Sequence, residues 1–218
     1  MANDRHLSAV RVRVSQEQID NLRTELAGVK NGVNKAVVGA INKTLPKGRT
    51  IVVDQLWEKL AIKRRGNIFH RTSVIKATSA NPAGAIRILG RQIGLINFKT
   101  KDTNARRRGG SGVIAQLYRS GESEIFPKAF IGIGASDNKH VFQRLPGKGH
   151  IITDKAHHKP NIGRRAQSLE SLKGMSLLKA YKDHPEIEAA SVEKVGAEFG
   201  NQLSSQIDRL LKRRKVTV

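Results

Sequence analysis

Residues 15–45 read SQEQIDNLRTELAGVKNGVNKAVVGAINKTL, and this stretch decides the fold more than any other. Apolar residues recur in it at spacings of three and four, which is typical of one buried face of a helix. That stripe consists of Ile19, Leu22, Leu26, Val29, Val33, Val37 and Ala40. Ser15 and Gln18 form a capping-box pattern that marks where the helix begins. The stretch therefore predicts one helix of about six turns.

Glycines interrupt this expected helix, and each destabilises an isolated helix by up to about 1 kcal/mol. They are Gly28, Gly32 and Gly39. Either packing supplies the missing stability, or the glycines permit another helix to approach closely. Pro46 is expected to kink or end the helix, because proline lacks the N–H of the helical ladder. A second amphipathic helix is expected to follow, with Leu56 and Leu60 on its apolar face and a stop at Gly66.

Further regular elements are expected towards both ends of the chain. Val10, Val12 and Val14 alternate with Arg11 and Arg13, which predicts an N-terminal strand. A C-terminal helix is expected from Pro185, with acidic residues in its first turn that suit the positive end of the helix dipole. Its apolar stripe is Val192, Val195, Phe199, Leu203, Ile207 and Leu210.

The middle of the chain changes to a period of two, which predicts strands. The expected strands cover residues 72–78, 85–89, 113–118, 125–133 and 140–145, and the first two are expected to form a hairpin through the Asn-Pro-Ala-Gly turn at 81–84. Two polar and basic segments, residues 99–112 and 146–165, are expected to be long loops.

The order of strand, helices, strands and helix predicts an α+β fold. We expect an N-terminal strand and long kinked helix, a central and mainly antiparallel β-sheet with long basic loops, and a C-terminal helix. No repeat or strong boundary divides the chain, so a single domain is expected over residues 1–218. Its parts are residues 1–65 (strand and helices), 72–145 (central sheet), 146–178 (basic loop and closing segment) and 179–218 (helix and basic tail).

The charge is the strongest indication of what surrounds the protein. Forty Lys and Arg stand against 18 Asp and Glu, which gives a net charge of +22 on 218 residues. A compact body with this surplus repels itself unless a polyanion or an acidic surface lies beside it, and nucleic acid is the commonest such neighbour.

Short runs of cations are the candidate contact residues. They are Lys63, Arg64 and Arg65; Arg106, Arg107 and Arg108; Arg164 and Arg165; and Lys212, Arg213, Arg214 and Lys215. Aromatic residues that could stack on bases do not interleave these runs, so any contact with DNA is expected to be with phosphates and without sequence preference. For any single run, a solvated charged face that aids solubility is an equally good explanation.

Catalytic and metal-binding patterns were sought in the same way. His150, His157, His158 and Asp154 lie near one another, but adjacent side chains on an extended loop point apart and no further ligand completes a tetrahedral set. The carboxylates that could serve a nuclease are scattered: Asp102, Glu122, Glu124, Asp137 and Asp154. The chain has no cysteine and no apolar stretch long enough to span a bilayer. We therefore expect no enzyme activity, no metal, no cofactor and no membrane association.

A set of motifs in a fixed order resembles the phage minor tail protein Z family, the tail-completion proteins of long-tailed phages. The motifs are Ala40–Thr44, Arg87–Phe98, Gly112–Val113, Phe126–Gly132, Val141–Arg144 and Gly163–Leu178, and the resemblance covers roughly residues 15 to 213. One departure is Gly174-Met175-Ser176, where the family usually has Gly-Pro-Ser.

The resemblance implies a structural virion protein at the head-proximal end of the tail, assembled in the host cytoplasm. The implied assembly is a homo-oligomer, a sixfold ring around the path of the genome. Its implied partners are the tail terminator, head-completion or neck proteins, the end of the tail tube or tape measure, and genomic DNA bound without sequence preference. The alternative from charge alone is a free, sequence-independent nucleic-acid-binding protein.

Overall fold

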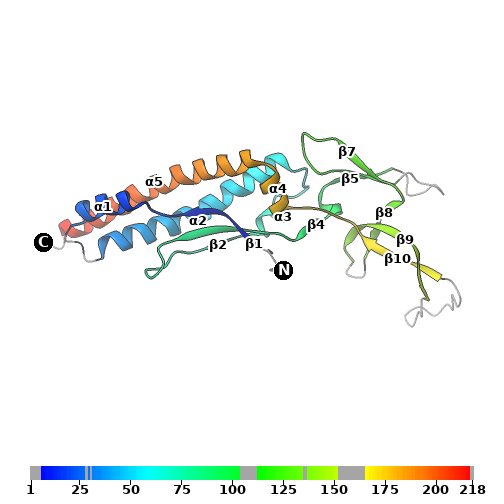
Figure 1. Ribbon diagram of the computed structural model, residues 1–218, viewed down its shortest axis with the longest axis horizontal. Helices are drawn as coiled ribbons and strands as arrows, with labels where there is room; N and C mark the ends of the chain where they lie inside the picture. The colour runs from blue at the N-terminus through cyan, green and yellow to red at the C-terminus, as the bar shows by residue number, and fades with distance from the viewer. Residues whose placement is uncertain are drawn as a thin grey trace. The chain divides into compact units, whose positions relative to one another are not determined.

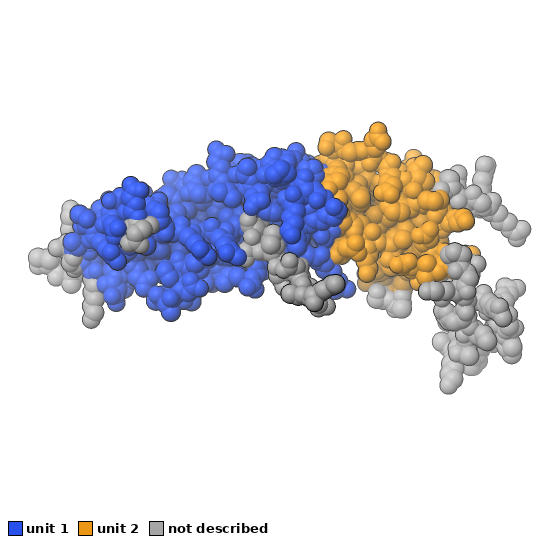
Figure 2. Space-filling view, viewed as in Figure 1, with its two compact units in different colours: residues 1–59, 64–91, 176–218 blue, residues 60–63, 92–175 orange. Residues whose placement is uncertain are grey.

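The computed structural model describes residues 6–27, 29, 31–103, 112–134, 137–151 and 165–216, and of residues 6–9, 16, 146–151, 165–168 and 214–216 the backbone alone. The chain forms two compact units, which Figure 2 shows in different colours. Unit 1 comprises Met1–Lys59, Arg64–Arg91 and Ser176–Val218, and unit 2 comprises Leu60–Lys63 and Gln92–Met175. The α+β class is confirmed, with helices near both ends and antiparallel sheets between them. A single domain over residues 1–218 stays a prediction.

Unit 1 contains a three-stranded antiparallel sheet and the long helices. Its elements are β1 (His6–Val12), α1 (Gln16–Glu25), α2 (Gly32–Lys59), α3 (Gly66–Phe69), β2 (Thr72–Ile75), β3 (Gly84–Leu89), α4 (Leu177–Asp183) and α5 (Pro185–Val216). The strand order is β1-β3-β2, and the expected hairpin of β2 and β3 is confirmed. In Figure 1, α2 and α5 run side by side along this unit.

Helix α2 packs against both the sheet and α5, and small residues make this possible. A Cβ at Gly48 would lie 3.0 Å from Cδ1 of Ile86 on β3 and 3.2 Å from Cγ2 of Val195 on α5. A Cβ at Gly39 would lie 2.9 Å from Oε1 of Gln206, again on α5. The glycine at position 39 therefore does permit the close approach of another helix, as its place in the stripe suggested.

Two ion pairs between described residues join α2 to α5, which run antiparallel to each other. Lys47 and Glu198 are 2.7 Å apart (Nζ to Oε1), and Lys59 and Glu186 are 3.3 Å apart. Hydrogen bonds from Lys47 and Gln202 hold the pKa of the Glu198 carboxyl below its ordinary value. These pairs are largely exposed, so each contributes little beyond fixing the alignment.

The expected single helix over residues 15–40 is wrong, because the chain leaves the helix after Glu25. The capping box at Ser15 is present, but the N–H of Leu26 bonds back to Leu22 and Thr24, and Asn31 adopts a φ of 56°. A Cβ at Gly32 would lie 2.9 Å from Cβ of Val29, so the turn between α1 and α2 is too tight for a larger residue.

Pro46 does not end a helix, since α2 runs through it to Lys59. Packing on two sides outweighs the loss of one backbone hydrogen bond, because Leu45 and Val52 on either side of the proline are fully buried. Gly66 is not a stop either, because it begins α3.

The C-terminal helix begins at Pro185 as predicted, but its buried stripe is rotated from the expected one. Val192 is 51% exposed, whereas Ser191 is fully buried beside Val195 and Phe199. Polar side chains thus occupy part of the face against α2, and an apolar residue that the periodicity placed in the core faces solvent. Burial raises the pKa of Tyr181, which lies at the start of this core on α4.

Unit 2 is built from short antiparallel strands. Its elements are β4 (Gln92–Gly94), the 3-10 helix η1 (Leu95–Asn97), β5 (Lys99–Asp102), β6 (Val113–Gln116), β7 (Ser123–Phe126), β8 (Ala129–Ile133), β9 (Lys139–Ile151), β10 (Arg165–Ser171) and β11 (Lys173–Ser176). The sheets have the strand orders β5-β6-β7, β10-β9-β8 and β11-β4.

The core of unit 2 forms around Phe98, which is fully buried. A Cβ at Gly174 would lie 2.6 Å from Cε2 of this ring, so only glycine fits where β11 crosses it. The segment Leu60–Lys63 joins the same core through its backbone. The N–H of Ala61 donates to Leu117 (2.9 Å), and the carbonyl of Ala61 accepts from the N–H of Lys99 (2.7 Å).

Strand boundaries in unit 2 differ from the expected ones in several places. Residues 125–133 form two strands rather than one, because Lys128 turns the chain with a φ of 62°. Both long loops are shorter than predicted. Lys99–Asp102 is β5, because it pairs with β6, and residues 146–151 continue β9, where they pair with β10.

We expect Gly84→Ala to lower the free energy of unfolding by about 1–3 kcal/mol, as overpacking of a filled core does. A Cβ there would lie 2.6 Å from Cγ2 of Ile41 and 2.9 Å from Cδ1 of Leu45, both on α2. The matched control is Gly196→Ala, since a Cβ at that position on α5 would have no described atom within 4 Å beyond its own stretch of helix backbone. The control should be neutral or stabilise the protein by up to about 1 kcal/mol. Urea denaturation measures both, and equal stabilities would contradict the packing of α2 on β3.

Candidate nucleic-acid interface

The run at residues 63–65 contains cations in three different situations. Lys63 donates from Nζ to the carbonyl of Ile96 (3.0 Å) and to Oγ1 of Thr100 (2.8 Å). Partial burial, and secondarily Lys139, lowers the pKa of its ammonium group. Arg65 donates from Nε to Oδ1 of Asp54 at 2.7 Å. Arg64 is exposed and has no side-chain partner among the described residues, so it alone in this run is available to an external anion.

The run Arg106–Arg108 lies outside the described residues, but the base of its loop is well defined. Thr103 donates to the carbonyl of Gly112 from its backbone N–H (3.1 Å) and from Oγ1 (2.6 Å). Asp102 and Val113 are then paired partners on β5 and β6. Thr103 and Gly112, the described residues on either side of positions 104–111, are therefore joined at the end of this hairpin. That the three arginines face DNA or an acidic partner stays a prediction.

Of the third run, Arg164 lies outside the described residues. Arg165 begins β10, where it pairs with Ile151, and only its backbone is described.

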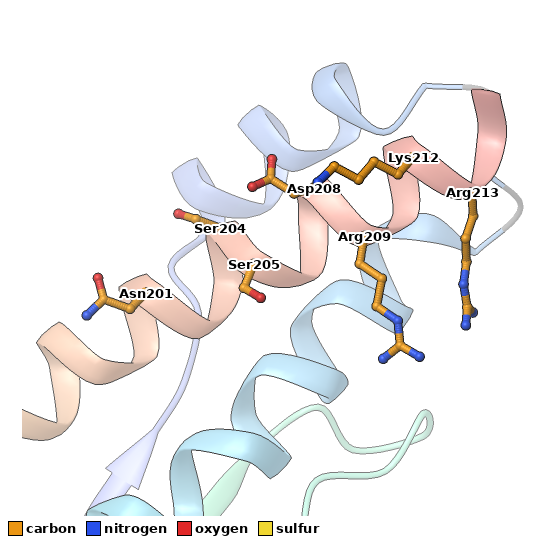
Figure 3. A pocket seen from close by; sticks show the side chains of 7 residues that line it. All are labelled: Asn201, Ser204, Ser205, Asp208, Arg209, Lys212 and Arg213. Atoms are coloured by element: carbon orange, nitrogen blue, oxygen red, sulfur yellow. The ribbon is translucent and has the colours of Figure 1, made fainter. Parts of the chain in front are cut away.

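The last run is helical rather than a tail, because α5 continues to Val216. Seven exposed residues of this helix line a shallow hollow of about 630 Å³: Asn201, Ser204, Ser205, Asp208, Arg209, Lys212 and Arg213 (Figure 3). In Figure 3 Lys212 extends towards Asp208, while Arg209 and Arg213 point away from it. One helix cannot enclose a ligand, so the hollow is an open cationic surface. Cations there also stabilise the negative end of the helix dipole. The side chains of Arg214 and Lys215 lie outside the described residues.

Some arginines outside the four runs serve the fold. Arg49 on α2 donates to the carbonyl of Phe69 (2.6 Å) and to Oγ1 of Thr72 (3.1 Å), and its guanidinium lies 3.5 Å from the centre of the Phe69 ring. This side chain fixes α3 and β2 to α2 within unit 1. The Arg49 guanidinium is therefore engaged in contacts within the fold and is not available to a ligand.

Other arginines come together that the runs did not single out. They are Arg11 on β1, Arg87 on β3, and Arg71 and Arg91, which precede β2 and follow β3. They are separated in sequence by apolar residues of the strands, so each stands alone in the chain. Alternation within a predicted strand was the signal that could have found them, since Arg11 and Arg87 each lie between two core residues.

The described residues hold no cluster of metal-ligating side chains. Within them, no three His, Asp or Glu side chains lie close enough to hold a metal ion. Asp154, His157 and His158 lie outside the described residues, as does the side chain of His150, so their expected lack of a metal stays a prediction. None of the described helices is both long and apolar enough to cross a bilayer.

Comparison with known protein families gives one result. The family of the prophage minor tail protein Z (GPZ) matches residues 16–214. The chain belongs to this family. It is accordingly a structural protein of a phage tail and a component of the virion. The comparisons with curated proteins and with solved structures returned no match.

Gly112 accepts two hydrogen bonds from Thr103 at the end of the β5-β6 hairpin, and Gly112→Ala should destabilise unit 2. Its φ is 109°, and a Cβ there would lie 2.1 Å from the carbonyl oxygen of Phe126. We expect a loss of about 1–3 kcal/mol in the free energy of unfolding. The control is Gly94→Ala, because the nearest atom to that Cβ is at 3.5 Å. Thermal unfolding compares the two, and a wild-type melting temperature for Gly112→Ala would contradict the described loop base.

Proposed function

We propose that this minor tail protein is a tail-completion or neck protein, a head-tail connector that forms a ring around the DNA path at the head-proximal end of the tail. Membership of the family supports a place in the tail. The feature that carries the finer proposal is the net charge of +22, since a protein of this charge needs a polyanion or an acidic surface beside it.

The pattern of ion pairs sharpens this reasoning. Lys47, Lys59 and Arg65 have carboxylate partners within the chain. Arg64 and the arginines of the unit 1 sheet have none among the described residues. Their charge is left for an external anion, and a closed ring around packaged DNA provides phosphates to every subunit at once.

We infer a homo-oligomeric ring with the sixfold symmetry of a tail. Its partners would be the tail terminator, head-completion or neck proteins and the end of the tail tube or tape measure. Contacts with genomic DNA would be to phosphates only, because the cationic runs carry no stacking aromatics.

A free, sequence-independent nucleic-acid-binding protein is the second candidate, and the same charge favours it. The two candidates predict different DNA affinities for the isolated chain. A free binder holds DNA tightly as an isolated chain, whereas a tail component binds weakly alone and acts in the assembly.

Electron microscopy of purified tails tests the location. We expect ring-shaped density at the head-proximal end of the tail tube, absent from tails assembled without this protein. Tails that contain the protein but show no such density at that end would refute the neck assignment.

A gel-shift titration at two salt concentrations tests the alternative. The tail proposal predicts non-specific affinity of the isolated chain no stronger than about 10⁻⁶ M at physiological salt. Much tighter, steeply salt-dependent binding by the isolated monomer would favour the free nucleic-acid-binding protein instead.

A further inference from the structure

The sheet of unit 1 has one face towards α2 and one away from it. Ile86 on β3 lies against Gly48 of α2, so the residues that alternate with it, Ala85 and Arg87, point to the opposite face. Cross-strand partners share a face. Arg11 is the partner of Ala85, and Ser73 is the partner of Arg87, so all of these residues belong to the face away from α2, here called the outer face.

Arg71 and Arg91 extend the same cationic region at one end of the strands. The carbonyl of Arg71 accepts from the N–H of Leu89, which continues the ladder of β2 and β3 by one pair. Its guanidinium donates to the carbonyl of Arg91 at 3.3 Å. Partial burial, and secondarily the charge of Arg91, lowers the pKa of Arg71, so two like charges lie close together without a compensating acid.

The described strands and turns of the outer face carry no negative charge of their own. Residues 6–13 and 71–91 contain Arg11, Arg13, Arg71, Lys76, Arg87 and Arg91 and no Asp or Glu. No described carboxylate forms an ion pair with any of these arginines. Arg11, Arg87 and Ser73 are exposed, and Arg87 is two residues along β3 from Ala85, the partner of Arg11.

We propose that the outer face of the β1-β3-β2 sheet binds the phosphate backbone of double-stranded DNA. This inference rests on the proposed DNA path and names the surface that would line it. Five of the six cations in residues 6–13 and 71–91 are arginine, whose planar fork binds phosphate in two places. The Ser73 hydroxyl, opposite Arg87 on β2, is a further donor to phosphate.

The test is a fluorescence anisotropy titration of the full-length protein with a short duplex DNA of random sequence at low salt. The test variant is Arg11→Gln with Arg87→Gln. The matched control is Lys43→Gln with Lys194→Gln, which removes the same charge from two exposed lysines of α2 and α5 that lack described partners. Circular dichroism melting checks that both variants fold, as exposed replacements should.

We expect the test variant to bind DNA about tenfold more weakly or worse, and the control to change by less than about twofold. The slope of log K against log salt should fall by about two in the test variant alone, one for each lost phosphate contact. Arg11→Lys with Arg87→Lys should restore the slope, because it restores the charge.

Three results would overturn the proposal. These are wild-type affinity in the test variant, equal weakening of test and control variants, and tighter binding of the wild type to polyglutamate than to DNA. The last would identify an acidic protein surface as the partner. A ring at the tail end together with unchanged affinity of the test variant would refute this surface alone. A missing ring with selective loss of affinity would refute the neck assignment alone.

Discussion

The close packing of α2 against both the sheet and α5 is the constraint on which unit 1 depends. Glycines at three points set the distances: Gly39 against Gln206, Gly48 between Ile86 and Val195, and Gly84 against Ile41 and Leu45. A chain with only 4% aromatic residues cannot fill wide gaps between its layers. Bringing the layers together with glycine lets Val, Ile and Leu complete the core at normal density. This explains why Gly39 and Gly48 lie inside α2, although glycine destabilises an isolated helix.

That packing also explains which sequence-based predictions held. The capping box at Ser15, the β2-β3 hairpin, the start of α5 at Pro185 and the α+β class were all predictable, because each depends on residues close in sequence. The break between α1 and α2 was not, since it depends on a positive φ at Asn31 that apolar periodicity does not reveal. The passage of α2 through Pro46 was not predictable either, because burial on either side of the proline decides it. The placement of Leu60–Lys63 was not predictable either, because the partners of its backbone hydrogen bonds, Leu117 and Lys99, are distant in the sequence.

The candidate interface shows a similar division. Runs of cations were easy to find, yet a run does not reveal which of its members the fold uses. Asp54 pairs with Arg65, and Thr100 and Ile96 engage Lys63, so only Arg64 is left unpartnered in that run. The family was recognisable from ordered motifs, but no motif specifies a contact residue. Partners of a cation are fixed by packing, and this information is absent from local sequence.

Strand alternation has a general consequence: a cationic surface on a sheet does not show up as a run of cations in the sequence. In a half-buried strand every second residue belongs to the core, so cations on the open face are always separated by apolar residues. Arg87 lies between Ile86 and Ile88, and Arg11 between Val10 and Val12, and neither forms a run. Antiparallel pairing then brings such isolated residues near one another on one face. In a helix, by contrast, the members of a run point in different directions around the axis. The open face of a sheet can therefore present several guanidinium groups to a polyanion even where the sequence shows no basic cluster.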